Sequence, residues 1–137
     1  MQSETVLDML RSLADGEYAV FQLGLIPGVA PERVLGVRTP ALRKLARELR
    51  GTAEAEQFMA ELPHGYYDEN NLHGLLINEM RSYDAALAAL EAFLPHVDNW
   101  ATCDILSPRA FKTRPEGLMD EVRAWLSSGR TYTVRFG

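Results

Sequence analysis

The chain has 137 residues, of which 47% are hydrophobic and 24% charged, and its formal net charge is −5. This composition is typical of one globular domain and excludes a disordered chain. No apolar run approaches the roughly 20 residues that span a bilayer, so a membrane is not an expected partner. The N-terminus has no basic region ahead of an apolar one, which argues against a secretory signal.

Helical patterns recur along the whole chain, and no useful length alternates with the period of two that marks a strand. The breaks fall at proline and glycine, as in the loop over residues 26–36. Thr39 and Pro40 read as a cap and a first-turn proline, and Gly51 closes the helix that they open. In chain order the expected helices cover residues 5–14, 17–25, 39–50, 52–62, 67–80, 83–94 after a Ser82 cap and 98–106, followed by one opened by Pro115 and the start of another at Tyr132.

Helices of about three turns joined by short breaks predict antiparallel pairs stacked side by side. Each pair is rotated slightly against the last, so the stack curves and leaves a concave surface for a long ligand. We therefore expect an all-α fold of about eight helices, a curved α-solenoid without a sheet. Solenoids of this kind bind proteins as well as nucleic acids, so the fold alone does not decide the function.

The acidic average hides two basic blocks. Residues 33–50 carry a net charge of +5 and residues 105–137 carry +3, against −4 for residues 1–32 and −9 for residues 51–104. Phosphate binding needs local clusters, because each contact releases counterions locally. The alternative interpretation is a solvated helix face, which is what most charge runs are. The first block contains Arg33, Arg38, Arg43, Lys44, Arg47 and Arg50, and the second contains Arg109, Lys112, Arg114, Arg123, Arg130 and Arg135.

Cysteine and histidine usage gives no sign of a metal. The single Cys103 excludes an intramolecular disulfide and argues for a reducing compartment, so we expect a cytoplasmic location. His64, His73 and His96 do not have the spacing of zinc ligands, and we interpret them as structural or solvated. Neither a metal nor another cofactor is expected.

The stretch from Leu94 to Phe111 holds the most informative residues. Asp98 is placed to cap a short helix, because its carboxylate can accept from first-turn N–H groups. Trp100 and Asp104 stand four residues apart in that helix, so they share a face, with Cβ atoms roughly 6 Å apart. An aspartate in mid-helix is a poor helix former and costly to bury, so it needs a reason. The plain reason is a structural ion pair with an arginine of a neighbouring helix.

The run Val97-Asp98-Asn99-Trp100-Ala101-Thr102-Cys103-Asp104 resembles the W-x-x-x-D segment of the bacterial DNA alkylation repair family. These are HEAT-like-repeat glycosylases that remove N3- and N7-alkylated purines from DNA. Three further segments resemble the family in the same order along the chain. They are the run GVRTPALRKLA over residues 36–46, WLSS over 125–128 and YTVRFG over 132–137.

The resemblance implies residue roles that the pattern alone does not give. Asp104 would stabilise the cationic transition state and orient the attacking water, and Trp100 would pack its ring against the lesion or the deoxyribose. Arg135 would hold the phosphate that flanks the lesion. The partner would be double-stranded DNA that carries alkylated purines. Basic residues Arg38, Arg43, Lys44 and Arg47 would contact its backbone.

One departure from the family separates two hypotheses. Family members continue through further helices after the Arg-Phe-Gly segment, and these helices carry another aromatic of the DNA-binding groove. We therefore expect residues 1–137 to form a single HEAT-like domain, the N-terminal part of a longer fold. An uncapped flank around Trp125, Leu126, Val134 and Phe136 would then favour self-association. The first hypothesis is an N-glycosylase, and the second is a non-catalytic HEAT-like module that binds nucleic acid or protein.

Alternatives remain for single residues as well. Trp100 and Trp125 are also explained as core aromatics, and Arg135 as the ion-pair partner of Asp104 in a protein that never meets DNA. Tyr66, Tyr67 and Asn70 begin or line a helix from which they could reach the groove. The enzyme needs Trp100, Asp104 and Arg135 all on the concave face, with Asp104 at least partly open to solvent. A buried Asp104 with every lone pair satisfied would favour the scaffold.

Overall fold

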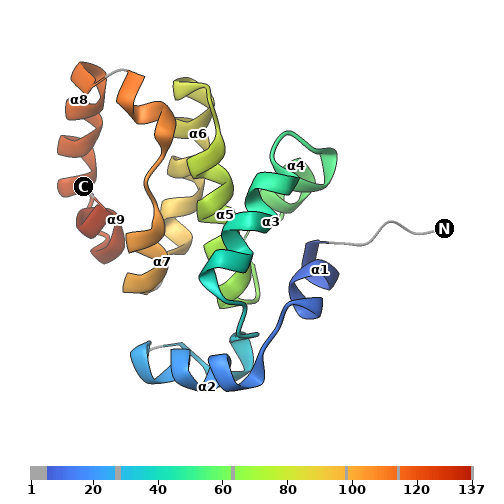
Figure 1. The fold of residues 1–137 in the computed structure, drawn as a ribbon. Coiled ribbons are helices and arrows are strands. Elements are labelled where there is room, and N and C mark those ends of the chain that lie inside the picture. The colour runs from blue at the N-terminus through green and yellow to red at the C-terminus, as the bar shows by residue number, and fades with distance from the viewer. Residues whose placement is uncertain (1–5, 27–28, 63, 98, 114, 137) are drawn as a thin grey trace.

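The computed structural model describes residues 6–26, 29–62, 64–97, 99–113 and 115–136. These residues form α-helices and short 3-10 helices, with no strand among them, which confirms the all-α prediction (Figure 1). None of the described helices is long and apolar enough to cross a membrane. The α-helices are α1 (Val6–Ser12), α2 (Gly16–Leu25), α3 (Thr39–Leu49), α4 (Ala53–Ala60), α5 (Tyr67–Glu79), α6 (Tyr83–Phe93), α7 (Trp100–Ile105), α8 (Pro115–Leu126) and α9 (Thr131–Phe136).

Local sequence sets most helix starts. The side chains of Asp15, Thr52 and Ser82 accept hydrogen bonds from first-turn N–H groups of α2, α4 and α6, so the Ser82 prediction is confirmed. The Thr39 prediction is off by one residue. Thr39 is the first residue of α3, and the cap is Arg38, which makes no side-chain capping bond. Pro40 is tolerated there because first-turn N–H groups have no helical partner.

Helix α5 is the centre of the fold, and α3, α6 and α7 pack around it. From Tyr67 to Asn78 all but one of its residues are buried. An amphipathic helix would bury one face, so burial all round marks a helix enclosed by its neighbours. One apolar cluster joins α5 to α1, α3 and α4. A second joins the other end of the array, where Ile77 of α5 packs with residues of α6, α7, α8 and α9.

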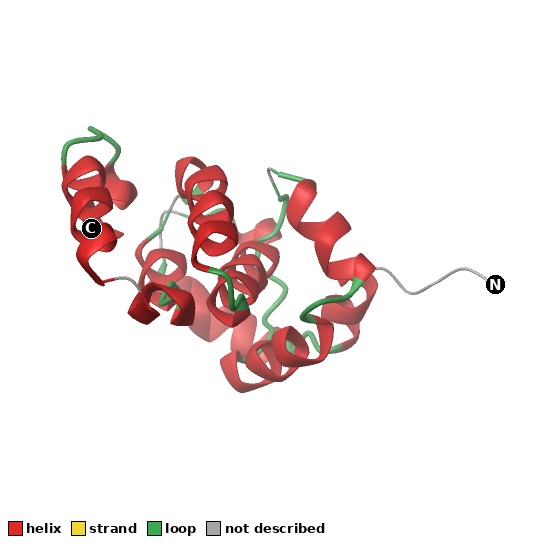
Figure 2. Ribbon diagram, turned by 90° about the horizontal axis from the view of Figure 1, so that it is seen from above, coloured by secondary structure: helices red, strands yellow, loops and turns green. Residues whose placement is uncertain are grey.

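The helices form a stacked array with α1 at one end and α8 and α9 at the other (Figures 1 and 2). This arrangement agrees with the solenoid prediction. Helix α9 is a full element where the sequence indicated only the beginning of one. The expected apolar flank is only partly exposed. Leu126 and Val134 are exposed, but Trp125 is buried against Phe111 and Phe136, so the prediction was wrong for Trp125.

Helix α2 stands apart from the stack and is held by the loop that leads into α3 (Figure 1). The buried carboxylate of Asp68 on α5 accepts from the N–H groups of Leu35 (2.6 Å) and Val37 (2.9 Å). Between them Gly36 has φ +87°, and its carbonyl accepts from the N–H of Asp15 at 2.9 Å. A Cβ at Gly36 would overlap the Asp15 carbonyl oxygen, so only glycine fits. The α5 core therefore fixes where α2 begins.

Candidate active site on helix α7

Helix α7 has only six residues, which is too short to be stable by itself. Asn99 caps it by accepting from the N–H of Thr102 at 2.8 Å. The Thr102 hydroxyl in turn donates to Asn71 of α5 at 2.7 Å, in the buried interface between the two helices. At the other end Asn78 donates to the Ile105 carbonyl (2.9 Å) and accepts from the N–H of Ser107 (2.7 Å). Helix α5 therefore holds both ends of α7.

The sequence misplaced this helix slightly. It predicted residues 98–106 with Asp98 as the cap, whereas α7 covers Trp100–Ile105 and the cap is Asn99. Asp98 itself lies outside the described residues. Asparagine and aspartate are equally good caps, so the choice between two adjacent residues depends on the backbone and not on propensity.

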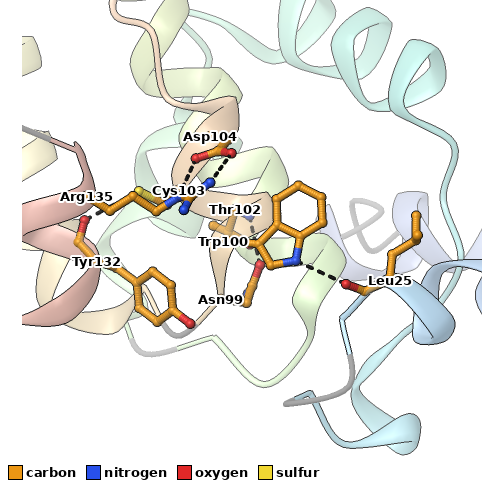
Figure 3. Close-up of polar contacts among 8 residues, drawn as sticks. All are labelled: Leu25, Asn99, Trp100, Thr102, Cys103, Asp104, Tyr132 and Arg135. Carbon is orange, nitrogen blue, oxygen red and sulfur yellow. Dashed lines mark hydrogen bonds and ion pairs between the residues drawn. The ribbon is translucent and has the colours of Figure 1, made fainter.

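Asp104 and Arg135 form a two-bond ion pair across α7 and α9 (Figure 3). The Nε of Arg135 lies 2.8 Å from Oδ1 of Asp104, and one Nη lies 2.7 Å from Oδ2. The Asp104 side chain is 45% exposed, so the carboxylate is open to solvent on its other side. The hydrogen bonds from Arg135 lower the pKa of Asp104 below its usual value, which keeps the group ionised at neutral pH.

Trp100 projects from the same helix toward α2 (Figure 3). Its indole N–H donates to the carbonyl of Leu25, the last residue of α2, at 3.0 Å. Trp100 is 42% exposed, so it is not a core aromatic. A tryptophan anchored by its N–H with an open ring face presents a flat π surface at a fixed orientation.

Trp100 and Asp104 line a pocket of about 560 Å³ between α3, α5 and α7. We call it the central pocket. Its basic lining residues are Arg43, Arg47, Arg109 and Lys112, and its acidic ones are Glu79 and Asp104. Its other lining residues are mostly polar, and they include Gln22, Thr39, Tyr67, Asn71, Asn78 and Ser107.

The remaining candidate residues divide into two groups. Arg43 and Arg47 lie on the wall of the central pocket, and Tyr67 also lines it. Arg38 does not line it, because its guanidinium pairs with Asp15 at 3.0 Å and lies over the ring of Tyr18. Lys44 is exposed on α3 outside the pocket.

Tyr66 and Asn70 do not line the pocket either. The Tyr66 hydroxyl accepts from Arg11, and Asn70 is buried. Each immediately precedes a residue of the pocket wall, Tyr67 or Asn71, and adjacent helix positions point in directions roughly 100° apart.

Sequence reasoning missed two residues that shape the site, and it did not place two others there. Asn71 and Asn78 hold α7, and a signal was present, because buried asparagines inside an apolar helix need hydrogen-bond partners. Arg109 and Lys112 of the 3-10 helix η3 (Arg109–Thr113) reach the pocket from the second basic block. Their block was noted as basic, but nothing in the spacing placed it in one pocket with residues of α3.

Metal ligation has no support in the described residues, which contain no group of three or more His, Cys, Asp or Glu arranged to hold an ion. His64 and His73 are instead a buried pair, with a ring-nitrogen distance of 2.8 Å. His64 stacks on Phe58 and His73 on Phe93. These two histidines are structural, as one of the two predicted alternatives stated.

The fold and the pocket define an all-helical stacked protein with a basic, solvent-open cavity beside an exposed carboxylate. A family model described as DNA alkylation repair enzyme matches residues 6–137, and the chain belongs to this family. The searches of curated proteins and of solved structures found no match. Family membership supports a role in DNA alkylation repair, which agrees with the resemblance seen in the sequence.

Proposed function

We propose that this protein is a DNA N-glycosylase that removes cationic N3- and N7-alkylated purines from duplex DNA. The observation that carries the proposal is the exposed Asp104 carboxylate, paired with Arg135 and one helical turn from the open face of Trp100, on the wall of a basic pocket. A DNA-repair protein works where the chromosome is, so a cytoplasmic location is part of the proposal.

The reaction needs electrostatic help more than acid catalysis. An N3- or N7-alkylated purine already carries a positive charge, so it leaves with the electron pair of the C1′–N bond without first taking a proton. Positive charge then develops on the deoxyribose, and water adds at C1′ and gives up a proton. A carboxylate beside the sugar stabilises that charge and orients the water. Asp104 has the required charge and solvent access.

Trp100 and Arg135 take supporting roles in this proposal. The Trp100 ring would pack against the cationic base or the sugar, a contact worth about 0.5–2 kcal/mol. Arg135 uses Nε and one Nη on Asp104, so its second Nη remains to donate to a phosphate oxygen. The same guanidinium would therefore tie the carboxylate to the strand that carries the lesion.

A second candidate function is a non-catalytic helical module that binds nucleic acid or protein. The Asp104–Arg135 pair favours it, because a surface ion pair accounts for both residues without any reaction. The partial exposure of Asp104 and its place on the pocket wall favour the enzyme over the module.

The deciding experiment is release of a modified base. Duplex DNA methylated to carry 7-methylguanine is incubated with the chain, and the free base is separated and quantified. The enzyme predicts release that grows with protein concentration and leaves an abasic site in the strand. A non-catalytic module would release the base no faster than the spontaneous rate, whether or not it binds the duplex.

A further inference from the structure

The charged residues of the central pocket come from two different parts of the chain. Arg43 and Arg47 lie on α3, and Arg109 and Lys112 lie on η3, which follows α7. The two pairs therefore reach one cavity from separate elements. In the sequence they belong to separate basic blocks with the acidic segment of residues 51–104 between them.

Both acidic residues of the pocket are already ion-paired. Asp104 is bound by Arg135 through two hydrogen bonds. The Glu79 side chain is only 9% exposed and bridges Arg50 at 3.1 Å and Arg109 at 3.4 Å. Arg50 and Arg135 do not line the central pocket, so two of the three cations that pair with its carboxylates lie outside the lining. Most of the positive charge of the lining is therefore not cancelled by the carboxylates of the pocket.

Three of the four basic residues have no competing partner nearby. Arg43, Arg47 and Lys112 form no ion pair with any residue in the described part of the chain. Arg109 is paired, but the Glu79 carboxylate fixes it at the pocket edge, and its side chain is 69% exposed. An exposed guanidinium held at one end is preorganised for a second anion.

We infer that Arg109 and Lys112 form a second phosphate-binding wall of the central pocket, which contacts the phosphodiester backbone of duplex DNA in addition to Arg43 and Arg47. This inference rests on the proposed function for its ligand, but it concerns binding and not base release. In a protein with a net charge of −5, a cavity whose free charge is positive is the place where a polyanion binds. Glu79 acts as a positioning residue for Arg109.

The test is the salt dependence of binding to unmodified duplex DNA, followed by fluorescence anisotropy. Each lost phosphate contact should reduce the slope of log affinity against log salt by about 0.9. The double variant Arg109→Gln/Lys112→Gln should therefore lose about 1.8 from the slope. At 0.1 M salt each substitution should weaken binding roughly eightfold, because the same slope sets the counterion term.

The matched control removes two positive charges from the same basic block outside the pocket. Arg123 and Arg130 are exposed, and neither lines the central pocket. Arg123→Gln/Arg130→Gln should leave the slope within experimental error of the parent. A second variant, Arg109→Lys/Lys112→Arg, keeps the charge and should keep the slope, which separates loss of charge from loss of fold.

Two results would overturn the inference: a pocket variant that keeps the parental slope, or a control variant that loses as much slope as the pocket variant. Because the DNA is unmodified, the outcome is independent of base release. Normal base release with an unchanged slope would reject the second wall alone, whereas a lowered slope without base release would reject the glycosylase alone.

Discussion

Asp104 and Trp100 owe their geometry to contacts that lie outside the pocket. A spacing of four residues places them on one face of α7, but Arg135 orients the carboxylate and the Leu25 carbonyl orients the indole. Each side chain has one anchored edge and one open edge. A side chain held in this way loses little further entropy when it meets a ligand.

Substitution of Trp100 separates the ring from its anchor. Trp100→Phe keeps an aromatic face but removes the N–H that donates to Leu25, whereas Trp100→Ala removes both. If the ring packs against the cationic lesion, Ala should lower the single-turnover rate by up to roughly 30-fold and Phe by only a few-fold. Both variants should unfold within about 1 kcal/mol of the parent, because the ring is half exposed. Equal rates for Phe and Ala would show that the ring face has no role.

The buried histidine pair predicts acid sensitivity. Burial lowers the pKa of both His64 and His73. Repulsion from His64 lowers the pKa of His73 further, and repulsion from His96 acts on both. Among the described residues, Glu69 is the carboxylate that contacts the pair, with Oε2 4.0 Å from Nδ1 of His64. In the unfolded chain each histidine binds a proton below about pH 6.5, whereas in the folded protein both stay neutral until lower pH. The free energy of unfolding should therefore fall as pH drops below about 6.5.

Urea unfolding at pH 7.5 and pH 5.5 checks this. Below about pH 6.5 each histidine lowers the free energy of unfolding by up to about 1.4 kcal/mol per pH unit. The free energy of unfolding should therefore be about 3 kcal/mol lower at pH 5.5 than at pH 7.5. His64→Gln/His73→Gln should be less stable at pH 7.5 but show a flatter pH dependence. His96→Gln, at a half-buried histidine outside the stacked pair, serves as the control and should keep most of the slope. A parent protein equally stable at both pH values would contradict the account.

At the scale of elements, α7 is the part most dependent on its surroundings. Six residues cannot form a stable helix alone, so its position is set by α5 through Asn71 and Asn78. The close approach of the two helices at Gly74, where a Cβ would lie 3.1 Å from Leu106, supports the same contact. The candidate site is therefore a property of the α5–α7 interface.

Asn78→Leu tests that dependence. It leaves the Ile105 carbonyl and the Ser107 N–H without their partner, at about 1–3 kcal/mol for each group. We expect a lower midpoint in urea unfolding and a loss of base release larger than the unfolded fraction explains, since α7 would shift. Gln57→Leu on α4, where the amide meets only the Glu61 side chain, is the matched control. Unfolding of Asn78→Leu at the parental midpoint would contradict the assigned role.

The sequence predicted the elements well where local chemistry decides them, and less well where packing does. Helix α6 begins after Ser82 as expected, because a serine cap acts through its own first turn. The cap of α7 was wrong by one residue, because two adjacent residues were suitable caps and tertiary contacts selected Asn99. Periodicity placed Trp125 correctly on an apolar face, but its cover by Phe136 depends on α9, whose short pattern gave little signal.

For the site, spacing alone joined Trp100 to Asp104, since they lie on one helix. The Asp104–Arg135 pair was an alternative that no local pattern could select, because the two residues are 31 positions apart. For the same reason, the sequence could not predict that basic residues of α3 and η3 line one pocket. A charge block marks a face of its own helix, and only the fold shows what that face meets.

At the scale of the whole molecule, the charge is separated in a way that fits a DNA-repair role. An acidic protein repels a polyanion on average, and the repulsion keeps non-specific contacts weak. The central pocket reverses the sign locally, since its basic residues are in excess and its carboxylates are paired. Binding should therefore be modest, strongly salt-dependent and confined to the surface that carries Trp100 and Asp104.

The most direct test of the central claim is Asp104→Asn, measured by single-turnover release of 7-methylguanine and by thermal unfolding of the same samples. Asparagine keeps the shape and one hydrogen bond to Arg135 but removes the charge, so the rate should fall on the order of 10²–10³-fold. Because an exposed ion pair contributes about 0–1 kcal/mol, the melting temperature should change little. Asp120→Asn, the same change at an exposed carboxylate of α8, should leave both quantities at the parental level. Release within a few-fold of the parent, together with a clearly lower melting temperature, would contradict the account and make Asp104 a structural residue.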